Sequence, residues 1–529
     1  MSTSKELSRR ALRLRTPELH TLKLRTLKLH TLKLLSLAAL FALSSFNASA
    51  QEAAAQATPQ AAAQATPPPP AAPRSVTVPK PVERTLPNGL RVVVVERTNM
   101  PLVSAAFVIK NGGEVDPPQL AGVADLTASL LTKGTATRNA PQIAEAIEAL
   151  GGSIQSGARW DASTASVGVQ SSRIAPAMEI LADVVRRPTF KDEEIERLRQ
   201  QYLDDLTVAL GQPGSIARYV ASRVVFGDAP YGHPLSGTPE SIARIKRDDI
   251  ARMHATYYRP DNAILVIGGD IRPEEAFKTA ERFFGDWQKP AAPLPAQSAK
   301  TTQANTTGAS APQPRIVVID KPDAGQAAVL VARTGIRRTD PEFFRGIVAN
   351  SVLSGYSGRL NQEIRIKRGL SYGARSALET RRETGPFTAE AQTKNESGAV
   401  VAGLLLGELS RLANGELPDA ELTPRKAVLI GGFARNLETA DGLVAQVASL
   451  ALHGLNFEEI NNYINNVQMI TAKDVQGFAG SRLDSRAANV IIVGDAKKFL
   501  PELQKQYKNI EVIPIAELDL NIAQLRKTK

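Results

Sequence analysis

The chain has 529 residues, of which 43% are hydrophobic and 22% charged, and it contains no cysteine. This composition is typical of a globular protein, and the length predicts about three structural units. The lack of cysteine excludes disulfides, thiolate zinc sites and cysteine nucleophiles.

The formal net charge of +11 is concentrated at the start of the chain. Residues 1–50 hold nine lysines and arginines and two acids, which leaves 55 basic and 51 acidic residues elsewhere. A surface that binds nucleic acid needs a concentrated basic patch. No basic block follows residue 50, so we expect no nucleic-acid partner.

The first 50 residues have the organisation of a signal peptide. A basic segment (5–33) precedes an apolar run (34–43), and Ala48-Ser49-Ala50 provides a small-residue cleavage site. The apolar run is shorter than the roughly 20 residues that span a bilayer, so we expect no stable membrane insertion after cleavage near Ala50. These features predict a periplasmic protein. A mitochondrial transit peptide is the alternative, because the basic segment is poor in acids.

Composition and hydrophobic periodicity divide the remainder. Residues 51–83 are rich in Ala, Pro and Gln and predict a disordered spacer. An N-terminal domain (84–288) and a C-terminal domain (315–515) follow, separated by a linker (289–314) that has no hydrophobic pattern. A C-terminal tail (516–529) completes the chain.

Each domain shows alternating strand and helix patterns in the same order. In the N-terminal domain the patterns predict strands at 91–96 and 103–109 and within 153–171 and 258–270, and helices at 123–132, 142–150, 174–186, 192–210 and 247–257. In the C-terminal domain they predict strands at 315–320, 327–334, 370–380, 385–393 and 488–495, and helices at 343–353, 397–412 and 418–437. The fold class is therefore α+β, built from two tandem copies of one unit.

The stretch 122–135 predicts a helix that ends in a Lys-Gly-Thr turn. In zinc peptidases with the inverted motif H-x-x-E-H, two histidines share one helix face and the glutamate acts on the metal-bound water. Here Asp125, Ala128 and Ser129 stand where that motif would place His, Glu and His. The stretch thus has the form of a metal-binding helix without its ligands.

Several motifs together resemble one known family. They are Leu86-Pro-Asn-Gly-Leu-Arg91, Gly122-Val-Ala124 with Leu131-Thr-Lys-Gly-Thr135, Tyr258-Arg-Pro-Asp-Asn262, Ser357-Gly-Arg-Leu-Asn-Gln-Glu-Ile-Arg365 and Arg368-Gly-Leu-Ser-Tyr372. In order and spacing they are similar to the family of pitrilysin, insulin-degrading enzyme and the mitochondrial processing peptidase. The similarity extends over residues 82–515.

The resemblance implies that each domain is an antiparallel sheet covered by helices, and that two such chains enclose a peptide chamber. It places Asp205 about where active members have the glutamate that is their third zinc ligand. It also places Arg365 and Tyr372 at positions that contact the substrate backbone and the carbonyl under attack. Spacing alone favours a plainer interpretation, in which Tyr372 packs on its sheet and Arg365 is a solvated helix residue.

The chain lacks a visible hydrolytic centre. After the leader it has only His233, His254 and His453, none with a second His or Glu in ligand register, and it has no G-x-S-x-G nucleophile motif. An aspartate and a serine joined by Asp205 make a poor zinc site, because zinc prefers nitrogen or sulfur ligands. We expect no cofactor in this chain and zinc in a partner subunit.

Three hypotheses follow. The first is a non-catalytic subunit of a heterodimeric zinc peptidase, which closes the chamber on peptide substrates and supplies Arg365 and Tyr372 to a partner with H-x-x-E-H. The second is an inert scaffold or peptide-binding protein of the same fold, like core subunits of respiratory complexes. The third is an autonomous metalloenzyme that uses Asp125, Ser129 and Asp205.

Overall fold

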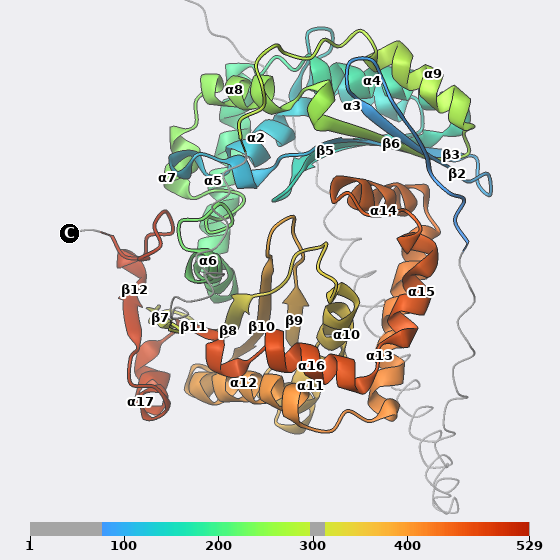
Figure 1. Cartoon of the computed structure of the whole chain (residues 1–529). Helices are drawn as coiled ribbons and strands as arrows, with labels where there is room; N and C mark the ends of the chain where they lie inside the picture. Colours follow the sequence, from blue (N-terminus) through green and yellow to red (C-terminus); the bar gives the residue numbers. More distant parts are fainter. Residues whose placement is uncertain (1–76, 297–312, 528–529) are drawn as a thin grey trace, which may run out of the picture. The chain divides into compact units, whose positions relative to one another are not determined.

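The computed structural model describes residues 77–296 and 313–527 (Figure 1). These residues belong to one compact unit, Pro73–Lys529. The predicted signal peptide, most of the predicted spacer and most of the predicted linker lie outside the described residues. Within the described ranges, no helix combines the length and the apolar character needed to cross a membrane.

The first half contains a six-stranded sheet in the order β1-β2-β6-β3-β5-β4. Its strands are β1 Val82–Thr85, β2 Arg91–Glu96, β3 Leu102–Ile109, β4 Ser153–Ala158, β5 Ser163–Gln170 and β6 Ala263–Gly269. The pairings are antiparallel except that of β2 with β6, which is parallel. All residues of β6 are buried, as expected for a central strand with helices on both faces.

The helices of the first half largely follow the predicted pattern. They are α2 Val123–Leu130, α3 Ala140–Glu148, α4 Ile174–Arg186, α5 Asp192–Gly211, α6 Pro213–Phe226, α7 Pro239–Arg244, α8 Arg247–Tyr257 and α9 Pro273–Phe284. The helices α2, α4 and α9 pack on one face of the sheet (Figure 1). The helices α6, α7 and α9 were not predicted.

The second half repeats this architecture with the strand order β12-β7-β11-β8-β10-β9. Its strands are β7 Ile316–Asp320, β8 Ala327–Thr334, β9 Ala374–Leu378, β10 Pro386–Thr393, β11 Asn489–Gly494 and β12 Glu511–Pro514. Its helices are α10 Phe343–Leu353, α11 Arg359–Asn361, α12 Gly398–Asn414, α13 Asp419–Leu437, α14 Ala440–Leu452, α15 Glu459–Met469, α16 Ala472–Arg482 and α17 Ala496–Gln506. Here β7 pairs in parallel with β11 and β12, and the other pairings are antiparallel. Two tandem helix-covered sheets are confirmed.

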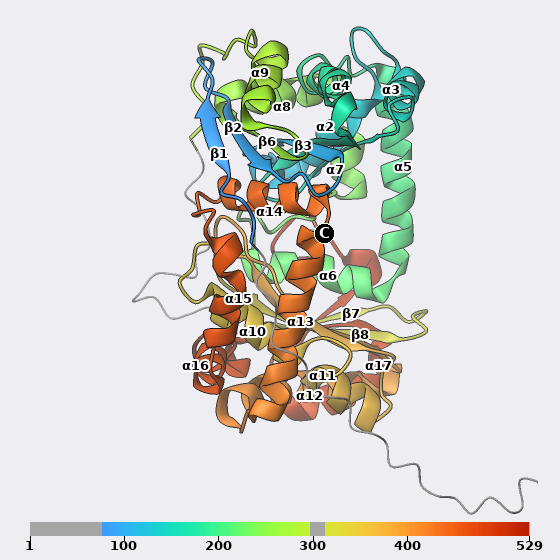
Figure 2. The ribbon, with the colours of Figure 1, turned by 90° about the vertical axis from the view of Figure 1, so that its right-hand side faces the viewer.

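The two halves exchange helices. The helix α14 of the second half packs on β3 and β6 of the first sheet, and α6 of the first half packs on β8 and β11 of the second (Figure 2). The first contact buries Leu443, Val444 and Val447 against strand residues that include Val95 and Val266. Each sheet therefore has helices on both faces, one of them supplied by the other half.

The segment after residue 515, predicted as a tail, packs on α6. Leu520 and Leu525 are buried in the same cluster as Ile216 and Val220 of α6. The buried Arg223 guanidinium donates to the carbonyl of Leu520 at 2.7 Å. The segment thus covers part of the contact between α6 and the second sheet.

Candidate functional site

The start of α2 is fixed by a buried carboxylate. The backbone N–H groups of Gly122 and Ala124 donate to Asp116 at 2.7 and 2.9 Å. Gly122 has φ 94°, and a Cβ there would lie 2.9 Å from Ile242 Cδ1, so this position favours glycine by both conformation and space. Burial raises the pKa of Asp116 well above its ordinary value.

Tyr202 of α5 joins the degenerate motif positions on α2. Its hydroxyl donates to Asp125 Oδ2 at 3.1 Å and lies 2.9 Å from Ser129 Oγ. The other Asp125 oxygen accepts from the backbone N–H of Ala158, and Ala128 between them is fully buried. Burial raises the pKa of both the Asp125 carboxyl and the Tyr202 phenol. A phenol hydroxyl, which the sequence analysis missed, bridges the positions where the motif has histidines.

Asp205 lies one helical turn beyond Tyr202 and is exposed. It makes no hydrogen bond to Asp125 or Ser129 in the described structure, whereas Tyr202 bonds both. The only sequence signal for Tyr202 is its place as the sole aromatic residue of α5.

These residues do not fit a zinc ion. The side chains at these positions offer only oxygen atoms as metal ligands, whereas zinc sites favour histidine or cysteine. The Asp125 and Ser129 oxygens are also already hydrogen-bonded to Tyr202. Among the described residues, no group of three or more His, Cys, Asp and Glu side chains is arranged to hold a metal.

The three histidines pack against backbone carbonyls. His233 contacts the carbonyl oxygens of Gly113 and Pro234. His254 contacts that of Val185, and burial lowers the pKa of His254 to about 4. His453 ends α14 and contacts the carbonyl of Ser449. These contacts account for the polar atoms of His233, whereas His453 Nε2 is buried without a hydrogen-bond partner among the described residues.

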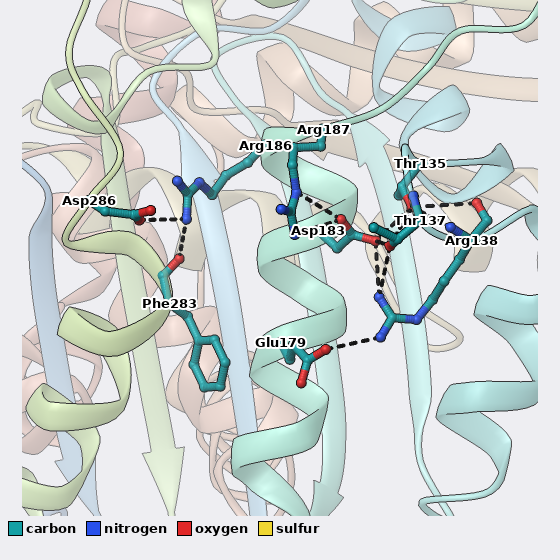
Figure 3. Close-up of polar contacts among 9 residues, drawn as sticks. All are labelled: Thr135, Thr137, Arg138, Glu179, Asp183, Arg186, Arg187, Phe283 and Asp286. Carbon is teal, nitrogen blue, oxygen red and sulfur yellow. Dashed lines mark hydrogen bonds and ion pairs between the residues drawn. The ribbon is translucent and has the colours of Figure 1, made fainter.

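The Lys-Gly-Thr turn is held by a second buried carboxylate, Asp183 of α4 (Figure 3). The hydroxyls of Thr135 and Thr137 each donate to Asp183 at 2.6 Å, and guanidinium groups of Arg138 and Arg187 each donate at 3.0 Å. Burial by itself would raise the pKa of Asp183, but these donors lower it below its ordinary value. The network ties the end of the degenerate helix to α4.

In the second half, Arg365 lies on the π-helix Gln362–Lys367. Its guanidinium lies 5.1 Å from the ring centre of Tyr356, which is 75% exposed. The neighbouring Glu363 pairs with Lys367 and Arg368, and no acid lies within ion-pair distance of Arg365 in the described structure. π-helical turns occur frequently at functional sites, since they displace side chains from the ordinary helical register.

Tyr372 is 93% exposed. The turn beneath it is fixed because Ser371 Oγ donates to the carbonyl of Gly373 and accepts from its N–H, at 2.7 and 3.1 Å. Tyr372 borders a groove of about 440 Å³ between α6 and the strands β8 and β10. Its hydroxyl has no partner among the described residues.

A larger cavity of about 1110 Å³ lies where the β9–β10 connection meets the first half. Arg382 of this connection donates to Glu114 Oε1 at 3.2 Å and to the carbonyls of Lys110 and Asp161 at 2.6 and 2.8 Å. Burial raises the pKa of Glu114 to about 7. No sequence pattern indicates this junction, because its members are far apart along the chain.

Comparison with known proteins agrees with this architecture. The family model described as "Insulinase (Peptidase family M16)" matches residues 91–238, and that described as "Peptidase M16 inactive domain" matches residues 244–429. An uncharacterized zinc protease of Mycobacterium leprae is 27% identical over 79% of this chain and 93% of its own.

Two solved structures share the fold. A peptidase M16 inactive domain from Pseudomonas fluorescens superposes with a TM-score of 0.71 at 26% identity, over 78% of this chain and 98% of its own. A chain of complex III from Candida albicans has a TM-score of 0.65 at 15% identity, over 79% and 96%.

Tandem helix-covered sheets, with a motif helix on which Asp125, Ala128 and Ser129 replace His, Glu and His, define a peptidase-like protein. The chain belongs to peptidase family M16, as a member that lacks H-x-x-E-H.

Proposed function

We propose that this chain is the non-catalytic subunit of a heterodimeric zinc peptidase. A partner of the same family, with H-x-x-E-H intact, supplies the metal and the activated water. This chain closes the peptide chamber and presents Arg365 and Tyr372 to the substrate.

The observation that carries the proposal is a contrast between the two halves. In the first half, the polar side chains at the motif positions, Asp125 and Ser129, are hydrogen-bonded to Tyr202 within the protein. In the second half, Arg365 and Tyr372 keep their donors available to a ligand, one on a π-helix and the other on an outward-facing turn. A chain without its own hydrolytic centre has no internal use for these two groups.

The chemistry of the pair suits endoproteolysis. A guanidinium offers several N–H donors to peptide carbonyls, and a phenol hydroxyl donates to the carbonyl oxygen as negative charge develops on it. Both groups act by hydrogen bonding and neither needs to exchange a proton with bulk solvent. They therefore complement a partner that supplies water activation.

The test is isolation of the tagged chain from its native extract, followed by an assay on a quenched, unstructured peptide. We expect a second chain of similar size and cleavage that a zinc chelator abolishes, while the chain purified alone is inactive. A stable complex without cleavage would favour the inert scaffold instead. Stoichiometric zinc in the dialysed chain alone would favour the autonomous metalloenzyme.

A further inference from the structure

The groove beside Tyr372 has the lining of a peptide-binding site. Gly214 and Ala217 of α6 form one wall with small side chains, and strands β8 and β10 form another. The exposed amides of Gln326 and Gln392 also line it and make no hydrogen bond in the described structure. Such amides offer both a donor and an acceptor to a peptide backbone.

The charges around the groove are unequal. Arg375 and Glu390 are its only charged lining residues among those described. Glu390 accepts from Arg375 at 2.6 Å through one oxygen and from Arg218 at 3.4 Å through the other. One carboxylate therefore faces two guanidinium groups, which leaves a local excess of positive charge.

Exposure increases this imbalance. The Glu390 side chain is 17% exposed, against 69% for Arg375 and 48% for Arg218. A ligand therefore meets the guanidinium groups before the carboxylate.

We infer that this groove selects unfolded peptides that carry a carboxylate, which binds beside Arg375 while Tyr372 contacts the neighbouring backbone. The inference rests on the proposed function, because it assigns the substrate class of the same site. The carboxylate is either an Asp or Glu side chain or the C-terminus of the peptide. Both sources present the planar anion that a guanidinium binds.

The experiment measures binding of fluorescently labelled, unstructured peptides to the full chain by anisotropy at low salt. One peptide carries a central Glu-Glu pair and its match carries Gln-Gln, and each is made with a free and an amidated C-terminus. We expect the carboxylate-bearing form to bind about fivefold tighter, the scale of one exposed ion pair. If affinity falls when Glu-Glu is replaced by Gln-Gln, the groove binds side-chain carboxylates. If affinity falls when the C-terminus is amidated, the groove binds the C-terminal carboxylate.

Two variants test the assignment. Arg375→Gln should reduce the preference for the carboxylate-bearing peptide to less than about twofold, because the charges of Glu390 and Arg218 then cancel. Glu390→Gln should increase this preference, because it removes the negative charge beside the two arginines. Arg486→Gln is the matched control, since this arginine is 89% exposed, pairs with Asp484 and does not line the groove.

The outcomes separate the inference from the proposed function. Equal binding of all peptides, or a preference that survives Arg375→Gln, would overturn the inference. If Tyr372→Ala still weakened binding of every peptide in that case, the proposed function would stand. Failure of all peptides to bind would count against both.

Discussion

At the scale of single residues, Tyr202 connects the two motif positions of α2 that carry polar side chains. Its hydroxyl is the shared partner of Asp125 and Ser129 in a partly buried setting. Polar groups in such places need partners, because desolvation is otherwise uncompensated. The phenol therefore holds α2 to α5 where active relatives of this fold would use ligands.

Removal of this hydroxyl should destabilise the protein. In Tyr202→Phe, Asp125 and Ser129 each lose a partner, and we expect the free energy of unfolding to fall by about 1–3 kcal/mol. Urea unfolding measures the change. Tyr219→Phe is the control, because the half-buried Tyr219 hydroxyl has no hydrogen bond among the described residues, and its effect should be below about 0.5 kcal/mol. Equal effects would contradict the bridging role.

Asp183 should contribute more to stability than Asp286, which Figure 3 shows paired with Arg186. Asp183 is 1% exposed with four donors, whereas Asp286 is 77% exposed and pairs with Arg186. We expect Asp183→Asn to lower the free energy of unfolding by about 2–4 kcal/mol and Asp286→Asn by less than about 1 kcal/mol.

The contribution of Asp183 to stability should depend on pH. Because its folded pKa is lowered, this contribution is present above its unfolded pKa and is lost as the pH falls through the folded pKa. The stability difference from Asp183→Asn should accordingly shrink in acid, and a constant difference would be inconsistent with the lowered pKa.

At the scale of elements, the sequence predicted most of what local patterns determine. The predicted limits of α4, α8 and α10 are those observed, because each has a regular apolar stripe with clear ends. The sequence analysis missed α6, α7, α9, α11 and α14 to α17. Of these helices, α6 and α14 pack their apolar faces on the sheet of the other half. It also missed the π-helix, since side-chain periodicity does not distinguish its hydrogen bonds from those of an α-helix.

The site was predictable to a similar extent. The motif frame indicated that Asp125, Ala128 and Ser129 share one helix, and the structure places them on α2. The frame could not indicate Tyr202, because this residue lies on α5, three positions before Asp205, where the motif has no ligand. Nor could it indicate Arg382 and Glu114, which meet only through tertiary contact.

The junction between the β9–β10 connection and the first half should depend on pH through Glu114. Its pKa is raised from 4.5 to about 7 by burial. The folded state therefore holds this proton more tightly, so the associated stability is present below pH 4.5 and is lost as the pH rises to about 7.

The corresponding variant is Glu114→Gln, measured by urea unfolding between pH 5 and pH 8. In the unmodified protein we expect the free energy of unfolding to fall by about 3 kcal/mol from pH 5 to pH 8 because of Glu114. In Glu114→Gln this decrease should be absent, in addition to any change that is the same at every pH. Asp116, with a pKa raised in the same direction, remains in the variant. An identical slope in both proteins would show that Glu114 titrates normally.

At the scale of the whole molecule, the exchange of α6 and α14 makes the halves interdependent. Each sheet has one apolar face that a helix of the other half covers. Both tryptophans, Trp160 and Trp287, lie in the first half. Trp287 packs against the core of that half, whereas Trp160 also contacts Arg381 of the second half, whose guanidinium lies 4.5 Å from its ring centre. Their fluorescence therefore reports on the first half and on its junction with the second.

A charge on the buried face of α14 should therefore unfold the first half more easily. Val447 is fully buried against the first sheet, and Val447→Asp should lower the tryptophan-detected stability by at least about 3 kcal/mol. Ala445→Asp, on the exposed face of the same helix, should change it by less than about 1 kcal/mol. An unchanged tryptophan transition in Val447→Asp would mean that the halves fold independently.

We propose that this chain supplies hydrogen-bond donors to an active site that it does not contain. The most direct measurement is the cleavage rate of the isolated complex with Tyr372→Phe, which removes one exposed hydroxyl. Loss of an oxyanion donor typically costs on the order of 10²–10³ in rate. We predict a loss of that order with co-purification of the second chain unchanged. An undiminished rate in a fully assembled complex would contradict the account.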